Sequence, residues 1–121
     1  MPEQDWERPV VAFEIRGRDS ARMRDFYREL FNWNIADGLL PNIAQVKPGI
    51  GGPVEGVGGV LLQSEEPAVL IYVQVANLKE SMAKVEQLGG SRVLEPIDIP
   101  AGPTIAQVRD PEGNLLGLIQ Q

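Results

Sequence analysis

The stretch VVAFEIRGRDSARMRDFYRELF, residues 10–31, carries the clearest indication of the fold. In VVAFEIRG (10–17), the residue types alternate with a period of two and several are β-branched, which is typical of a strand. Asp19 is a good N-cap for a helix that runs to about Leu30. The apolar residues of this helix recur at steps of three and four, which predicts a buried stripe. Its members are Met23, Phe26, Tyr27, Leu30 and Phe31.

The same order of elements recurs in the second half of the chain. AVLIYVQV (68–75) predicts a strand, and Asn77 caps a helix to Leu88 with Glu80 completing a capping-box pattern. Gly89-Gly90 ends this helix, whose predicted buried stripe is Leu78, Met82, Val85 and Leu88. Short strands are predicted after each helix, at about 33–37, 42–47 and 60–63, then 92–97, 103–109 and 114–120, with a turn at 110–113.

The chain therefore follows the order βαβββ twice. A shift of 58 residues superimposes the caps, the stripes and the strand ends of the two halves. We expect an α+β fold of two βαβββ modules, about 9–63 and 67–121, in one domain (9–121) after a flexible tail (1–8). Each sheet would have one face under its helix and one concave face.

Composition excludes several classes of function. The 121 residues include no cysteine and no histidine, and the net charge is −6. Disulfides, thiolate chemistry and Ser-His-Asp machinery are therefore excluded. The acidic balance argues against nucleic-acid binding, and no apolar run approaches a membrane span. The polar N-terminus is unlike a signal peptide, so we expect a cytoplasmic protein.

Three stretches resemble the vicinal oxygen chelate superfamily, which includes glyoxalase I, bleomycin-resistance proteins and extradiol dioxygenases. They are VVAFEIRGRDSARMRDFYRELFNW (10–33), GGSRVLEPIDIPAGP (89–103) and VRDPEGNLLGLIQ (108–120), and the resemblance covers residues 9–121. It implies paired βαβββ modules whose sheets curl around a cleft, and single-domain members are usually homodimers.

The resemblance also implies where a metal would be held. Metal-using members place one ligand on the first and one on the last strand of each module. The corresponding positions here are Ala12, Gly59, Leu70 and Gly117, none of which has a side chain that can donate to a metal. We therefore expect no metal and no cofactor, and metal-dependent glyoxalase or dioxygenase activity is not expected.

Three side chains are candidates for ligand contacts. Alternation places Glu14 on the cleft side of its strand, where it could act as a general acid or base, bind a cationic ligand, or form an ion pair with Arg16 or another arginine at the rim of the cleft. The ion pair is the favoured interpretation. Tyr72 offers a ring and a hydroxyl, or is simply a packed core or interface residue. Gln74 could orient a ligand or bond to a neighbouring strand.

Other conspicuous residues have structural interpretations. Trp33 is expected to anchor a core or an interface, and Trp6 to pack on a partner or to have no ordered role. The segment PGIGGPVEGVGG (48–59) lacks the Lys-Ser/Thr of a phosphate-binding loop, so a flexible loop or a lid over the cleft is favoured.

The functional prediction is a metal-independent protein that sequesters a small molecule, such as a drug or a metabolite, in a cleft. One alternative is a metal-free lyase or isomerase with Glu14 as general base. A second is a degenerate subunit that binds a protein partner. We expect a homodimer, and Glu14 makes a cationic ligand one option.

Overall fold

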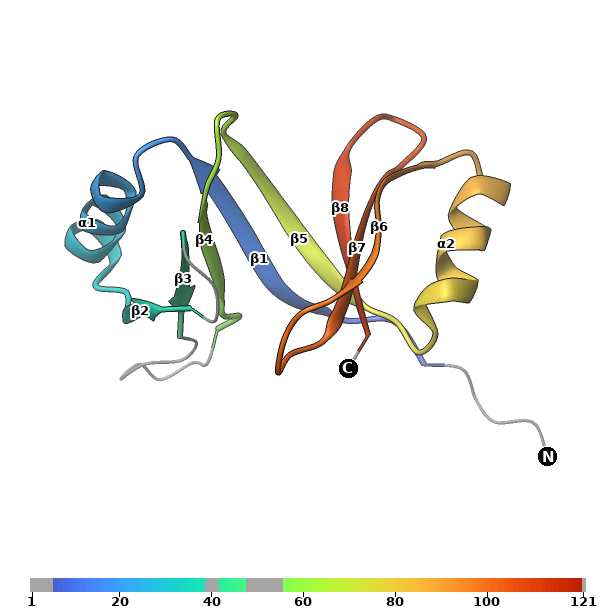
Figure 1. Cartoon of the computed structure of the whole chain (residues 1–121), viewed down its shortest axis with the longest axis horizontal. Helices are drawn as coiled ribbons and strands as arrows, with labels where there is room; N and C mark the ends of the chain where they lie inside the picture. Colours follow the sequence, from blue (N-terminus) through green and yellow to red (C-terminus); the bar gives the residue numbers. More distant parts are fainter. Residues whose placement is uncertain (1–5, 39–41, 48–55, 121) are drawn as a thin grey trace. The chain divides into compact units, whose positions relative to one another are not determined.

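The structure is a computed structural model that describes residues 6–38, 42–47 and 56–120. The described residues form two helices and eight strands in the order βαβββ–βαβββ, which confirms the two predicted modules (Figure 1). The chain divides into two compact units, Val11–Ile71 and Tyr72–Gln121 together with Met1–Val10. Most of the predicted glycine-rich loop, residues 48–55, and residues 1–5 of the predicted tail lie outside the described residues.

The first unit contains one helix and four hydrogen-bonded strands. Its elements are β1 (Val10–Gly17), α1 (Ser20–Phe31), β2 (Ile35–Asp37), β3 (Ile43–Val46) and β4 (Gly59–Gln63). The strands follow the order β2-β3-β4-β1, with β4 parallel to β1 and antiparallel to β3. The last strand of the module thus runs beside its first strand.

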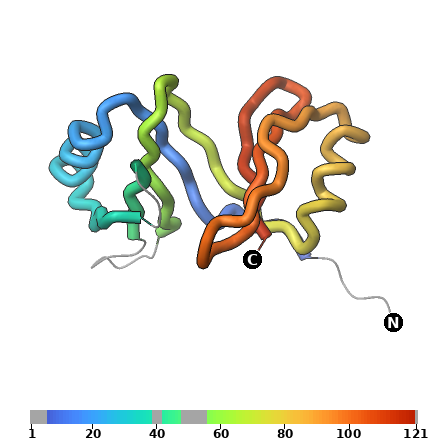
Figure 2. The backbone as a smooth tube through the Cα atoms, viewed as in Figure 1, coloured from blue at the N-terminus to red at the C-terminus, as the bar shows by residue number. Residues whose placement is uncertain are grey.

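The second unit repeats this topology. Its elements are β5 (Ala68–Gln74), which begins within the residue range of the first unit, α2 (Leu78–Gln87), β6 (Ser91–Asp98), β7 (Thr104–Arg109) and β8 (Leu115–Gln120). The strand order is β5-β8-β7-β6, again with the first and last strands parallel. Figure 2 shows the backbone turning from α2 into β6. The curl of the sheet around a cleft stays a prediction.

The helix ends are formed as the sequence predicts. The side chain of Asp19 accepts a hydrogen bond from the Arg22 N–H at 3.0 Å, and Asn77 accepts one from the Glu80 N–H at 3.0 Å. Each bond satisfies an N–H that has no partner within its helix. Gly89, at φ 94°, lets the chain leave α2 in the left-handed region that glycine favours.

Each unit has its own hydrophobic core. The first contains Ile35, Ala44, Val46 and Leu61, with Phe13, Ile15, Met23, Tyr27 and Trp33 packed against it. The second contains Val75, Leu78, Met82, Ala106, Val108 and Leu118. Trp33 stacks on Tyr27 with 5.0 Å between ring centroids, which supports its predicted role as a core residue. No helix in the described part of the chain combines the length and apolarity needed to cross a membrane.

For both helices, the predicted buried stripe includes apolar residues that the structure leaves exposed. Met23 and Tyr27 pack on the core, whereas Phe26, Leu30 and Phe31 are more than half exposed, at 57%, 58% and 52%. A spacing of three and four residues defines a broad stripe, and the sheet beneath α1 covers only part of it. In α2, Leu78 and Met82 are buried as predicted, but Leu88 is 68% exposed because it follows the last helical turn.

β6 is the outermost strand of its unit and is exposed along most of its length. Its pairing with β7 shifts register twice, between Arg92 and Leu94 and between Leu94 and Ile97. Pro96 lies within the second irregularity and has no N–H to donate. Arg92 forms ion pairs with Glu86 and Glu95 on this side of the unit.

The predicted turn between β7 and β8 is organised by the carboxylate of Asp110. It accepts hydrogen bonds from the N–H groups of Glu112 and Asn114 and from the Asn114 side chain, all at 2.9 Å. Gly113 completes the turn at φ 92°. The hydrogen bond from the Asn114 side chain, followed by the bonds from backbone N–H groups, lowers the pKa of Asp110 below its usual 3.8.

The turn should therefore make a pH-dependent contribution to stability. A carboxyl with a lowered folded-state pKa stabilises the protein above its unfolded pKa, and this contribution is lost as pH falls through the folded pKa. We expect Asp110→Asn to lower Tm at pH about 6 and the difference from wild type to close towards pH about 2. Thermal unfolding of both proteins across this range checks the expectation, and a gap independent of pH would contradict it.

Candidate functional site

Glu14 lies on the face of β1 that points away from the core of the first unit. Its neighbours Phe13 and Ile15 pack against that core, and alternation along the strand turns Glu14 to the other side. The residue is nonetheless buried, with 5% of its surface exposed. A buried carboxylate is costly unless it is paired and hydrogen-bonded, so its partner determines its chemistry.

Arg16 is that partner within the first unit. Its Nε donates to Glu14 Oε2 at 2.6 Å, and the two side chains are 19% and 7% exposed. This ion pair was the favoured interpretation of Glu14, and the structure confirms it. The two side chains thus form a largely buried, charge-assisted hydrogen bond on the face of β1 away from the core.

Tyr72 and Gln107 form a buried polar pair in the second unit. Tyr72 is 5% exposed and Gln107 is 8% exposed, and Gln107 Nε2 donates to the Tyr72 hydroxyl at 2.9 Å. Val73 and Val108, next to them in sequence, belong to or pack on the α2 core. The pair therefore lies on the face of this sheet away from α2. Of the two interpretations of Tyr72, its burial fits the packed residue better.

The ring of Tyr72 lies directly over Gly117. The two residues pair across β5 and β8, and a Cβ atom at Gly117 would come within 2.2 Å of Tyr72 Cε1 and 2.3 Å of Cδ1. Real Cβ atoms are not found at such distances, so any side chain at position 117 would have to displace the ring. The glycine is required here by close packing.

The positions that correspond to metal ligands do not form a donor set. Ala12 and Leu70 have only apolar side chains, and the ring of Tyr72 fills the space that a side chain at position 117 would need. Gly59 pairs with Phe13 and so lies on the core-side face of β4, whereas Val60 is the residue beside Glu14. In the described part of the chain, no group of three or more acidic, cysteine or histidine residues could hold a metal.

The register of β4 corrects the 58-residue shift used to compare the halves. Glu14 and Tyr72 are 58 residues apart, but their strand partners, Val60 and Gly117, are 57 apart. A slip of one residue moves a side chain to the opposite face of a sheet. The residue equivalent to Gly117 is thus Val60, and neither offers an atom that binds a metal.

Gln74 is the most accessible of the three candidate residues. It lies two residues after Tyr72 on the same face of β5 and is partly buried, whereas Glu14 and Tyr72 are nearly inaccessible. Its backbone N–H donates to the Pro9 carbonyl at 2.9 Å. The chain just after the tail therefore runs beside the end of β5.

A hollow of about 550 Å³ lies at the start of α1, away from the predicted residues. It is lined by Arg18, Asp19, Ser20, Ala21, Arg24, Asn42 and Gln63. Arg18 donates to the Glu65 carbonyl at 2.6 Å, and Arg24 to Asp37 at 3.3 Å. Ser20 Oγ and Arg24 Nε, which also belong to lining residues, are buried without a hydrogen-bond partner among the described residues.

Sequence reasoning missed Gln107. Alternation in TIAQVR (104–109) would have placed it opposite Ala106 and Val108, on the same face as Tyr72. Its contact with Tyr72 depends on the register of β5, β8 and β7, which brings Tyr72, Gly117 and Gln107 into one row across the sheet.

Residues 11–119 match the family model described as a glyoxalase-like domain. The chain belongs to the glyoxalase-like domain family. This confirms the superfamily that the sequence resembles. A glyoxylase-like domain-containing protein from Didymella fabae is 28% identical over 112 residues, which cover 87% of this chain and 88% of the relative.

Solved structures share the fold of this glyoxalase-like domain. A glyoxalase/bleomycin resistance protein/dioxygenase superfamily member from Vibrio splendidus 12B01 matches with a TM-score of 0.65 at 18% identity, covering 95% of this chain and 100% of that one. Methylmalonyl-CoA epimerase from Mycobacterium tuberculosis matches with a TM-score of 0.65 at 14% identity, covering 92% and 86%. At such identities the likeness concerns the fold, which hosts different activities.

Proposed function

We propose that this glyoxalase-like domain binds an organic small molecule without using a metal. The observation that carries the proposal is the row formed by Tyr72, Gly117 and Gln107. It puts an aromatic ring and two hydrogen-bonding groups on the face away from α2. Ligand sites typically combine apolar walls with a few fixed polar groups of this kind.

The three candidate residues would have different tasks. Tyr72, packed over Gly117 and bonded to Gln107, would form the rigid floor of the site rather than its main polar contact. The amide of Gln74, the most accessible of the three, would orient the ligand. In the first unit, Glu14 and its partner Arg16 are the groups that would attract a charged group of a ligand.

The lack of metal-binding side chains at the implied metal positions supports metal independence. Gly117 cannot be replaced by a ligating residue without moving Tyr72, and Val60 stands on the Glu14 side of β4. We further propose that the protein is a cytoplasmic homodimer, since members of the superfamily are commonly dimeric.

Native mass spectrometry of the purified protein, with metal analysis of the same sample, tests this function. We expect a bound organic mass that is retained without stoichiometric metal and is lost more readily from Gln74→Ala. Gln87→Ala, an exposed glutamine at the end of α2, is the matched control. A stoichiometric divalent metal that survives dialysis against a chelator would contradict the proposal.

Glu14→Gln separates binding from catalysis. If Glu14 holds a cationic group, the variant should bind the co-purified ligand about tenfold more weakly, since hydrogen bonds to charged groups contribute about 1.5–3 kcal/mol. We expect no turnover of this ligand by either protein. The rival, a metal-free lyase or isomerase, predicts turnover by wild type that disappears in the variant while binding survives. Glu66→Gln, at an exposed loop position, is the control.

A further inference from the structure

The hollow at the start of α1 is a feature of the first unit that the proposed function does not use. Its lining comes from the start of α1, the turn before β3 and the end of β4. β1 and β4 run parallel and pair at Gly17 and Gln63, so both strands end beside the start of the helix. The Gln63 N–H donates to the Asn42 carbonyl at 3.0 Å, which holds the turn at the same edge. All of the lining residues belong to the first compact unit.

The lining is polar and carries an excess of positive charge. Its charged groups are the guanidinium groups of Arg18 and Arg24 and the carboxylate of Asp19, which leaves one positive charge in excess. Arg18 donates to the Glu65 carbonyl, which is a neutral group. Of the remaining lining side chains only an alanine is apolar; they are Ser20, Ala21, Asn42 and Gln63. Such a lining is complementary to a polar ligand with a single negative charge.

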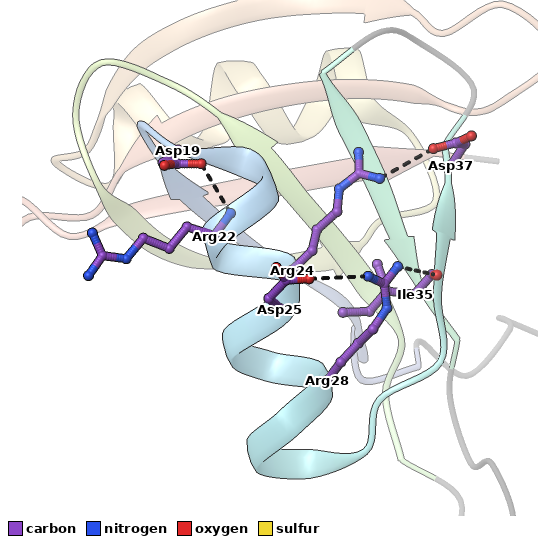
Figure 3. A network of polar contacts seen from close by, with 7 residues as sticks. All are labelled: Asp19, Arg22, Arg24, Asp25, Arg28, Ile35 and Asp37. Carbon is purple, nitrogen blue, oxygen red and sulfur yellow. Dashed lines mark hydrogen bonds and ion pairs between the residues drawn. The ribbon is translucent and has the colours of Figure 1, made fainter.

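Arg24 has hydrogen-bonding capacity that the first unit does not use. Its Nη1 donates to the exposed carboxylate of Asp37 at 3.3 Å, and Figure 3 shows its side chain extending from α1 toward that residue. Its Nε is buried and has no hydrogen-bond partner in the described part of the chain. Nε and Nη2 form one edge of a guanidinium group, and such an edge can bind both oxygens of a carboxylate through two parallel hydrogen bonds.

Ser20 adds a second unsatisfied group at the first position of α1. Its Oγ is buried, and together with Arg24 Nε it completes the set of buried side-chain atoms without a partner among the residues that the structure describes. The N–H groups of Ser20 and Ala21 also precede the first hydrogen bond within the helix. Buried polar groups normally have a partner from the protein, from water or from a ligand. Two exceptions in the lining of one hollow point to a bound group that supplies the missing partners.

We propose that this hollow binds a polar organic monocarboxylate, such as a hydroxy acid, at a site separate from that of the proposed function. The carboxylate would accept hydrogen bonds from the unused edge of Arg24 and from the N–H groups at the start of α1, where the helix dipole also favours an anion. The Ser20 hydroxyl and the amides of Asn42 and Gln63 would bind the hydroxyl groups of the ligand. A volume of about 550 Å³ is typical of small-molecule sites.

The charges of the lining favour a monocarboxylate over a phosphate ester. A single negative charge balances the excess of one guanidinium group over the Asp19 carboxylate. A doubly charged phosphate would exceed that balance and would be repelled by Asp19, which stays at the start of α1 because it accepts the Arg22 N–H.

Titration of the ¹⁵N-labelled full chain with sodium gluconate, followed by NMR, tests the site. Gluconate is the probe because it is a hydroxylated monocarboxylate, and sodium chloride at equal ionic strength corrects for screening. We expect the Nε–H signal of Arg24 to shift and saturate with a Kd of about 1 mM, which suits a polar ligand of this size. Sodium acetate, which lacks the hydroxyl groups, should shift the same signal with a higher Kd.

Replacing arginine by lysine tests the role of the guanidinium group. Arg24→Lys keeps the charge but removes the planar edge, so the gluconate Kd, followed at the Ala21 N–H, should rise at least about tenfold. Arg22→Lys is the matched control, because this side chain is not in the lining and extends away from Arg24 in Figure 3. It should bind gluconate like wild type. Gln74→Ala should do so as well, which separates this site from that of the proposed function.

Ser20→Ala should have different effects on stability and on binding. Because the hydroxyl is buried and unpaired in the free protein, its removal should leave Tm unchanged or raise it. The same change should raise the gluconate Kd about threefold, since one hydrogen bond to the ligand is lost. Thermal melting also checks that Arg24→Lys is folded. A lower Tm of Ser20→Ala with unchanged gluconate binding would show that the hydroxyl has a structural role and would overturn its part in the site.

Several results would overturn the proposal as a whole. They are shifts that sodium chloride reproduces, an Arg24 signal that does not move up to about 50 mM gluconate, and equal Kd values for Arg24→Lys and Arg22→Lys. Inorganic phosphate that saturates the same signals at a lower concentration than gluconate would assign the hollow to phosphate groups instead.

Discussion

Gly117→Ala should destabilise the protein by about 3 kcal/mol, although it adds a single methyl group. The new Cβ would fall 2.2 Å from Tyr72 Cε1, so the ring must rotate away from β8 and break its hydrogen bond with Gln107. A loss of this size lowers Tm by about 10 °C in a domain of this length. Thermal unfolding followed by circular dichroism measures it.

A double-mutant cycle identifies the cause. In a Tyr72→Ala background the ring is absent, so Gly117→Ala should cost much less than it does in wild type. Gly56→Ala is the matched control, because a Cβ atom at Gly56 would meet nothing within 4 Å. Equal costs of Gly117→Ala in the two backgrounds would show that the ring is not what excludes a side chain at this position.

Met82→Ala should have an effect of similar or larger size, from a cavity rather than from a clash. Met82 is 1% exposed and is one of the two largest fully buried side chains among the described residues. Truncation of a buried methionine costs about 2–5 kcal/mol, because neighbouring side chains only partly close the cavity. Chemical denaturation should give a lower midpoint with an unchanged slope.

The control for this change is on the same helix. Lys79 is exposed in the first turn of α2, and Lys79→Ala should alter stability by no more than about 0.5 kcal/mol. A Met82→Ala protein as stable as Lys79→Ala would contradict the packing of α2 described above.

Local signals in the sequence predicted the elements of this fold well. Asp19 and Asn77 begin the two helices because a side-chain oxygen three residues before an N–H can satisfy it in any fold. Alternation placed Glu14 and Tyr72 on the faces away from the helices, because successive side chains of any strand point to opposite faces of the sheet. Such signals depend only on residues close together in the chain.

Features that depend on contacts between residues far apart in the sequence could not be predicted from such local signals. Helical spacing assigned Phe26 to a buried stripe, but the extent of the sheet beneath α1 decides how much of that stripe is covered. A one-residue offset in β4 placed Gly59 on the core side. Gln107 meets Tyr72 through the pairing of two strands with β8, which no local pattern encodes.

The irregular outer strand β6 limits how copies of this protein can meet. A regular, exposed strand could pair with the same strand of another molecule and let sheets grow from chain to chain. Two register shifts, Pro96 and the charges around Arg92 interrupt the row of backbone groups that such growth would need. Fibril formation through this edge is thereby discouraged.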